Sequence, residues 1–252
     1  MSLNIDLTGR TALITGATQG IGKAIACQFE VGGAILILTG TNQSQIDELN
    51  AKMQEEGRQN TTYLQLDLSS DLSVDRFLKD MDGLTPVDIC VNNAGVNRVS
   101  SFAETSEEDF DWMHHVNLRG PYRILKYLLP HMQDQQYGRV VNIASIWSIV
   151  TRKGRSLYTT SKNALVGMTE ALAVELASDN VLVNAVSPGF TLTELTQRTN
   201  SASELAVIEG TIPLGRLAQP EEIANTVAFL CSNLNTYITG QNIAIDGGYT
   251  NL

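Results

Sequence analysis

The stretch TALITGATQGIG, residues 11–22, indicates the fold class of this chain of 252 residues. A β-rich run leads into a turn with glycines at positions 16, 20 and 22, and a helical pattern with Ile25, Ala26 and Phe29 follows directly. Such glycines let the backbone approach a pyrophosphate, whose charge the amides and dipole of the following helix would stabilise. The spacing G-x-x-x-G-x-G is a variant of the dinucleotide-binding fingerprint. A tight turn that binds no ligand is the alternative.

Six further β-rich runs follow the first, which we place at residues 11–15, and helical stretches separate them. They occupy residues 34–39, 62–66, 87–91, 140–144, 181–186 and 242–245. Several are apolar without alternation, such as AILIL at 34–38, as is typical of strands covered by helices on both faces of a parallel sheet. The sequence therefore predicts one α/β domain over residues 1–252, a Rossmann-type doubly wound sheet of seven strands. Residues 192–210 look like an insertion and are a candidate substrate lid, with a plain surface excursion as the alternative.

Composition narrows the function classes. The chain has 17 basic and 27 acidic side chains, a formal charge of −10, which disfavours nucleic acid as a partner. Residues 1–9 show no leader pattern and no run is long enough to span a bilayer, so we expect a cytoplasmic protein without a membrane anchor. Cys27, Cys90 and Cys231 lie in apolar patterns without zinc-type spacing, which predicts buried free thiols and no metal site.

Tyr158 and Lys162 stand four residues apart in a helical run and are therefore neighbours on one helix face. A nearby ammonium lowers the pKa of a tyrosine from about 10 towards the working pH, as proton transfer requires. Ser145 directly follows the strand at 140–144, and open α/β sheets bind ligands at such strand ends. Y-x-x-x-K alone also fits a packed tyrosine beside a solvated lysine, so the accompanying motifs decide its meaning.

Six motifs occur in order: Gly16/Gly20/Gly22, NNAG at 92–95, Asn117, Ser145, Tyr158/Lys162 and SPG at 187–189. With them the chain resembles the short-chain dehydrogenase/reductase family over essentially its whole length. The resemblance implies an NAD(P)-dependent oxidoreductase that interconverts a small ketone or aldehyde and its alcohol by hydride transfer. It also implies the strand order 3-2-1-4-5-6-7 and a homotetramer or homodimer built partly from the Tyr158 helix. The pattern is most similar to 3-oxoacyl-carrier-protein reductases and to sugar and polyol dehydrogenases.

The resemblance assigns roles to individual residues. Tyr158 would donate or accept the proton, and Lys162 would lower its pKa and hold the nicotinamide ribose. Ser145 would bind the substrate oxygen, and Asn117 would position a water that links Lys162 to solvent. The expected cofactor contacts are Gly16, Thr18, Gln19, Gly20, Ile21, Gly22, Thr41, Asp67, Leu68, Asn93, Ala94, Gly95, Tyr158, Lys162, Pro188, Gly189, Phe190 and Thr193.

The second strand does not end in the acidic residue that binds a ribose hydroxyl in NAD-specific sites, because TGTN stands at 39–42. Thr18, Gln19 and Thr41 occupy the positions where an Arg or Lys could pair with a 2′-phosphate. We therefore expect NADP(H) or NAD(H), with a lean towards NADP(H). Asp67 is a candidate contact for the adenine amino group, or simply a turn residue at a strand end.

The segment between Ser145 and Tyr158 contains TRKGR at 151–155, an unusual basic cluster in an acidic chain. An anionic group of the substrate could be received there through paired charge-assisted hydrogen bonds. The candidate substrate contacts are Arg98, Trp147, Arg152 and Arg155. A solvated loop or salt bridges between subunits are the alternatives for the arginines, and a core plug for the tryptophan.

Three other functions remain to be weighed. A 3-oxoacyl-carrier-protein reductase would hold an acidic carrier with basic residues, but QDQQ at 133–136 and Val174 stand in the expected places. A non-catalytic dinucleotide-binding protein usually lacks the tyrosine or the lysine, and both are present. A hydrolase would need a G-x-S-x-G elbow and a histidine after the last strands, and neither occurs.

Overall fold

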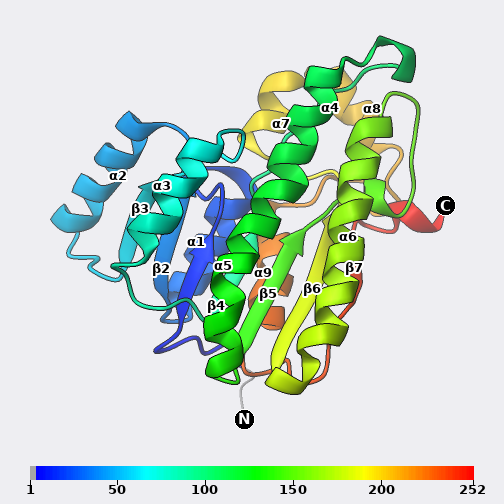
Figure 1. Ribbon diagram of the computed structural model, residues 1–252. Helices are drawn as coiled ribbons and strands as arrows, with labels where there is room; N and C mark the ends of the chain where they lie inside the picture. The colour runs from blue at the N-terminus through cyan, green and yellow to red at the C-terminus, as the bar shows by residue number, and fades with distance from the viewer. Residues whose placement is uncertain (1–3) are drawn as a thin grey trace.

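A computed structural model describes residues 4–252, with the backbone alone at Leu195 and Thr199; residues 1–3 of the segment searched for a leader lie outside it. Seven parallel strands form one sheet in the order β3-β2-β1-β4-β5-β6-β7 (Figure 1). The predicted fold class, strand number and strand order are confirmed. The strands are β1 (Thr11–Ile14), β2 (Ile35–Gly40), β3 (Thr61–Gln65), β4 (Ile89–Asn92), β5 (Gly138–Ile143), β6 (Val181–Pro188) and β7 (Asn242–Ile245).

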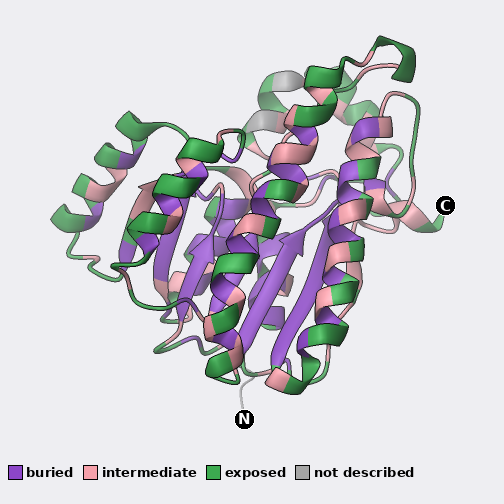
Figure 2. Cartoon of the chain, in the orientation of Figure 1, coloured by how far each residue is buried: buried purple, intermediate pink, exposed green. Residues whose placement is uncertain are grey.

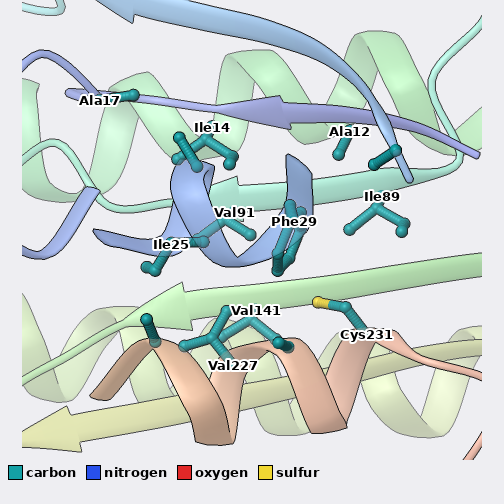
Figure 3. Close-up of a cluster of buried hydrophobic side chains, with 14 of the residues drawn as sticks. Ala12, Ile14, Ala17, Ile25, Phe29, Ile89, Val91, Val141, Val227 and Cys231 are labelled. Carbon is teal, nitrogen blue, oxygen red and sulfur yellow. The ribbon is translucent and has the colours of Figure 1, made fainter. Parts of the chain in front are cut away.

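Helices cover both faces of the sheet (Figures 1 and 2). Successive residues of a strand point to opposite faces, so Ile14 packs with α1 and α9 in one cluster while Leu13 packs with α3, α5 and α6 in the other. Figure 3 shows the first cluster, in which Phe29 and Val227 lie beside strand residues. The helices are α1 (Gly20–Val31), α2 (Gln43–Glu55), α3 (Asp71–Met81), α4 (Glu107–His114), α5 (Gly120–Asp134), α6 (Ser156–Leu176), α7 (Glu194–Thr199), α8 (Ala202–Glu209) and α9 (Pro220–Cys231).

The prediction of three buried thiols is wrong for one of them. Cys90 and Cys231 are buried, but Cys27 is exposed on α1. Ile25 and Phe29 of α1 are fully buried against the sheet. Cys27 follows Ile25 by two residues, which is about 200° around an α-helix. An apolar neighbourhood in the sequence therefore did not place this residue on the buried face.

The candidate lid at residues 192–210 folds mainly as two short helices, α7 and α8, which lie above the carboxyl ends of the strands (Figure 1). Thr193 caps α7 by accepting a hydrogen bond from the Thr196 amide (3.2 Å), and Ser201 with Glu204 forms a capping box on α8. Closure of this segment over a substrate stays a prediction.

Residues 4–252 lack both a membrane-spanning helix and a metal-binding cluster. No helix has both the length and the apolar character that crossing a bilayer requires. No group of three or more His, Cys, Asp or Glu side chains in that part of the chain could hold a metal ion.

Candidate active site

The glycine turn after β1 is fastened to the NNAG turn after β4. The Thr15 hydroxyl accepts hydrogen bonds from the amides of Asn93 and Ala94, both at 3.0 Å. In return, the Asn93 side chain donates to the carbonyls of Thr15 (2.8 Å) and Gly16 (3.0 Å). The two neighbouring parallel strands thus present their carboxyl ends as one rigid edge, where such sheets bind ligands.

Close packing explains why this turn needs glycine. A Cβ on Gly22 would lie 2.3 Å from the Gly16 carbonyl oxygen and 2.4 Å from the Asn93 side-chain nitrogen. Gly16 and Gly20 adopt φ angles of +64° and +55°, which residues with a Cβ rarely adopt. Gly22 therefore serves the packing of α1 against the turn, while Gly16 and Gly20 supply its backbone shape.

The N-terminus of α1 already holds an anionic group. The Gly20 amide donates to a carboxylate oxygen of Glu194 at 3.1 Å, and Gln19 provides no side-chain cap. A helix N-terminus stabilises negative charge, so a phosphate and this carboxylate would favour the same place. Glu194 could not be selected from the sequence, because its only local signal is its position after Thr193 at the start of α7.

The predicted adenosine end of the site is polar. The Thr39 hydroxyl accepts a hydrogen bond from the Gly16 amide at 3.2 Å, and Thr41 beyond it is exposed. Asp67 accepts hydrogen bonds from the amide and the hydroxyl of Ser69, at 2.9 and 2.6 Å, and so caps its own turn. A contact between Asp67 and adenine stays a prediction. The other predicted cofactor contacts follow or end β1, β3, β4 and β6 at the same edge, namely Thr18, Gln19, Ile21, Leu68, Gly95, Pro188, Gly189 and Phe190.

Ser145 and Tyr158 meet at the carboxyl end of β5. One residue, Ala144, separates Ser145 from the end of β5. Tyr158 lies in the first turn of α6. The Ser145 side chain lies near enough to the phenol to influence its protonation. Burial raises the pKa of Tyr158, and the interaction with Ser145 and the positive charge of Arg155 act in the opposite direction. The structure therefore brings together the two hydroxyl groups that the sequence assigned to one substrate oxygen.

Lys162 lies one turn further along α6 and is buried. Its ammonium donates a hydrogen bond to the carbonyl of Ile143 at 2.7 Å and lies 5.7 Å from the centre of the Tyr158 ring. Burial lowers the pKa of Lys162 from 10.5 to about 8. The predicted effect of Lys162 on the pKa of Tyr158 stays a prediction, because the charge that acts on the phenol in this structure is that of Arg155.

Asn117 is fully buried in a π-helical turn, His115–Arg119, between α4 and α5. Its side chain accepts from the Val96 amide (2.8 Å) and donates to the Val96 carbonyl (2.9 Å) and the Ser161 hydroxyl (3.0 Å). The amide thus joins the segment after NNAG to the catalytic helix. Its predicted role in positioning a water remains untested.

A buried polar chain that sequence analysis missed fixes α6 beneath the site. Asn92 donates to Asn142 at 2.8 Å, Asn142 donates to the Thr169 hydroxyl at 2.8 Å, and Thr169 donates to the Leu165 carbonyl. Fully satisfied networks of this kind specify one packing arrangement. The available signal was the isolated asparagine in the apolar strand VVNI at 140–143.

Trp147 forms the centre of an aromatic cluster beside Ser145. Its ring makes edge contacts with Phe190 and with Tyr249, both at 6.1 Å between ring centres. Sequence analysis named Trp147 and Phe190 but not Tyr249, which lies near the end of the chain. Arg98 pairs with Asp109 and lies 5.5 Å from the ring centre of Trp112, and its contact with a substrate stays a prediction.

Comparison with known proteins decides the family. Residues 16–250 match the family model described as enoyl-(acyl carrier protein) reductase. The 3-oxoacyl-[acyl-carrier-protein] reductase FabG of Aquifex aeolicus is 38% identical over 247 residues, which cover 98% of this chain and 99% of that protein. The chain belongs to the short-chain dehydrogenase/reductase family. The predicted class, an oxidoreductase that acts on CH–OH groups with NAD or NADP, is confirmed, and the hydrolase and non-catalytic alternatives fall away.

Solved structures of this family superpose closely on the chain. A short-chain type dehydrogenase/reductase from Mycobacterium marinum gives a TM-score of 0.88 at 34% identity, covering 98% of this chain and 97% of that one. A gluconate 5-dehydrogenase from Burkholderia cenocepacia J2315, in complex with NADP and tartrate, gives a TM-score of 0.91 at 27% identity, with 98% of each chain covered.

Proposed function

We propose that this short-chain dehydrogenase/reductase interconverts a small ketone or aldehyde and its alcohol, with NADP(H) preferred over NAD(H) and Tyr158 as the acid-base residue. The observation that supports it best is the closeness of Ser145 and Tyr158 at the carboxyl end of β5, with Lys162 buried one turn beyond. A phenol and an alcohol that meet in this way can both address one substrate oxygen.

The reaction balances as carbonyl compound, NADPH and one proton on one side, and alcohol and NADP⁺ on the other. The bound dinucleotide supplies or accepts the hydride. During reduction, Tyr158 gives its proton to the substrate oxygen while the Ser145 hydroxyl donates a hydrogen bond to it. Both donors act where negative charge develops, so they stabilise the transition state more than the ground state. Lys162 stabilises the phenolate that remains until solvent returns the proton.

The preference for NADP(H) rests on residues 39–42, where the second strand ends. No carboxylate stands in TGTN to repel a 2′-phosphate. Asn42 begins α2 as its cap, accepting a hydrogen bond from the Gln45 amide at 3.1 Å, so a helix N-terminus opens beside Thr41. The NADP in the related Burkholderia cenocepacia enzyme agrees with this preference.

We infer that two or four copies assemble through α5 and α6. Val174 on α6 is 84% exposed, and a groove of about 1120 Å³ beside α5 is lined by charged side chains, such as Arg123, together with Tyr122 and Met168. Aromatic side chains, methionine and arginine are enriched in protein interfaces. Sedimentation at micromolar concentration tests this: Val174→Asp should yield smaller particles than the wild type, and a monomeric wild type would contradict it.

A 3-oxoacyl-carrier-protein reductase is a second candidate, favoured by the identity to the Aquifex aeolicus enzyme. The exposed Val174 stands where a basic contact to the carrier is expected, which speaks against it.

Turnover measurements separate the two candidates. Wild-type protein with NADPH or NADH should be offered 3-oxoacyl thioesters, ketosugars and small oxo acids under identical conditions. The proposed function predicts reduction of small carbonyl compounds and faster turnover with NADPH. Exclusive use of 3-oxoacyl thioesters would establish the second candidate, and no turnover of any compound would refute both.

A further inference from the structure

Two guanidinium groups lie against the Trp147 ring. The Cζ atom of Arg152 is 5.1 Å from the ring centre and that of Arg155 is 5.5 Å from it. Arg152 also lies 5.9 Å from the centre of Phe190. Aromatic faces attract cations but do not neutralise them, so this corner of the site retains two positive charges.

Neither guanidinium group has an anionic partner among residues 4–252. Neither forms a salt bridge, and the Nε of Arg155 is buried without any hydrogen-bond acceptor. Partial burial and the charge of the exposed Arg152 both lower the pKa of Arg155. Six of the nine other arginines hold a carboxylate, namely Arg10, Arg58, Arg98, Arg119, Arg123 and Arg216. Arg139 also has a buried Nε without an acceptor, but it lies on β5 away from the Trp147 ring and faces Tyr137.

The pair lies beside the proposed reacting oxygen. The Trp147 amide donates to the Ser145 hydroxyl at 3.3 Å, which connects the aromatic cluster to the catalytic serine. Arg155 precedes Tyr158 by three residues, and its charge acts on that phenol. Phe190 and Tyr249, at 5.4 Å between ring centres, complete the cluster. A small molecule bound at Ser145 and Tyr158 therefore lies beside the Trp147 ring that carries the two guanidinium groups.

We propose that Arg152 and Arg155 bind an anionic group of the substrate, a carboxylate or a phosphate, and so restrict the enzyme to small hydroxy and oxo compounds that carry one. The proposal rests on the proposed function, because it places the reacting oxygen at Ser145 and Tyr158. A planar guanidinium donates paired hydrogen bonds to either anion, and the buried Nε of Arg155 gains the acceptor that it lacks.

Binding to the enzyme saturated with NADP⁺, measured by calorimetry, tests the proposal without turnover. The probes are matched pairs: gluconate and gluconamide, tartrate and tartaramide, glycerate and glyceramide, and glycerol 3-phosphate and glycerol. We expect at least one anion to bind about 10-fold or more tightly than its neutral partner, as charge-assisted hydrogen bonds provide. The pair that shows the preference identifies the anion as carboxylate or phosphate. Equal affinities within every pair would overturn the proposal.

Variants localise the effect. Arg155→Gln and Arg152→Gln should each weaken binding of the preferred anion by about 10-fold or more while leaving its neutral partner unchanged. Lys153→Gln is the matched control, because it removes the same charge from an exposed position of the same segment and should change affinity by less than about 2-fold. Equal losses in all three variants would indicate general electrostatics and would contradict a built subsite.

Anion binding and carbonyl reduction are measured independently, so the subsite and the proposed function can fail separately. Selective anion binding in an enzyme that reduces no carbonyl compound would refute the proposed function alone. Carbonyl reduction in an enzyme without anion selectivity would refute the subsite alone. Thermal unfolding and NADP⁺ affinity of each variant, both expected to match the wild type, show that the fold is retained.

Discussion

Gly22 is the position where a single methyl group tests the packing of the cofactor-binding turn. In Gly22→Ala the new Cβ would lie 2.3 Å from the Gly16 oxygen, about 1 Å closer than an ordinary contact, and 2.4 Å from the Asn93 side-chain nitrogen. That nitrogen donates two hydrogen bonds, at 2.8 and 3.0 Å, that join the turns. Displacing it costs about 1–3 kcal/mol for a lost buried hydrogen bond, and overpacking adds about 1–3 kcal/mol.

We therefore expect Gly22→Ala to lower the free energy of unfolding by roughly 2–6 kcal/mol, the sum of these two terms. Urea denaturation at fixed protein concentration measures it. Gly83→Ala is the control, because Gly83 lies after α3 without a positive φ angle and a Cβ there would approach only the Asp80 oxygen, at 4.0 Å. This control should be more stable by about 0.4–1 kcal/mol, since alanine restricts the unfolded chain. A Gly22→Ala protein as stable as the wild type would refute the packing argument.

Three other substitutions test separate parts of the account. Glu194→Gln should bind NADP⁺ about 2- to 5-fold more tightly in a fluorescence titration, because it removes a negative charge that competes for the Gly20 amide; weaker binding would contradict this. Thr41→Asp should reverse the cofactor preference to NAD⁺, seen as an inverted ratio of kcat/KM values, since a carboxylate repels the 2′-phosphate; an unchanged ratio would place that phosphate elsewhere. Between about pH 8 and 10.5, Lys162 is mostly deprotonated in the folded protein and protonated in the unfolded chain. The free energy of unfolding should therefore rise with pH more steeply in the wild type than in Lys162→Met. Parallel profiles for the two proteins would contradict the low pKa of Lys162.

Sequence patterns predicted most of the fold because parallel strands buried on both faces are continuous apolar runs. The ends of the strands shifted for local reasons. β4 begins at Ile89 rather than Val87, where the side chain of Asp88 is bound by the Thr11 amide at 2.9 Å and by Arg10. β6 extends to Pro188, which forms the last position of the strand.

The candidate site was predictable where its residues share a short segment and not where they meet across the fold. Spacing alone relates Tyr158 to Lys162, since both lie on α6. The bond from Gly20 to Glu194 joins residues 174 positions apart, which no local pattern contains. Likewise, sequence gives the charge of Arg155 but not its lack of an acceptor, because that depends on which side chains surround it in the folded protein.

Tyr158→Phe tests whether Tyr158 transfers a proton to the substrate oxygen, with turnover and NADP⁺ binding measured on the same preparation. Removing an acid-base group costs about 10²- to 10⁴-fold in rate, whereas a phenyl ring fills the same space beside Ser145. We predict that kcat/KM falls by this factor of about 10² to 10⁴. The NADP⁺ dissociation constant should stay within about 2-fold of the wild type, since the hydroxyl contributes only a modest binding interaction. Turnover within 10-fold of the wild type would contradict the account.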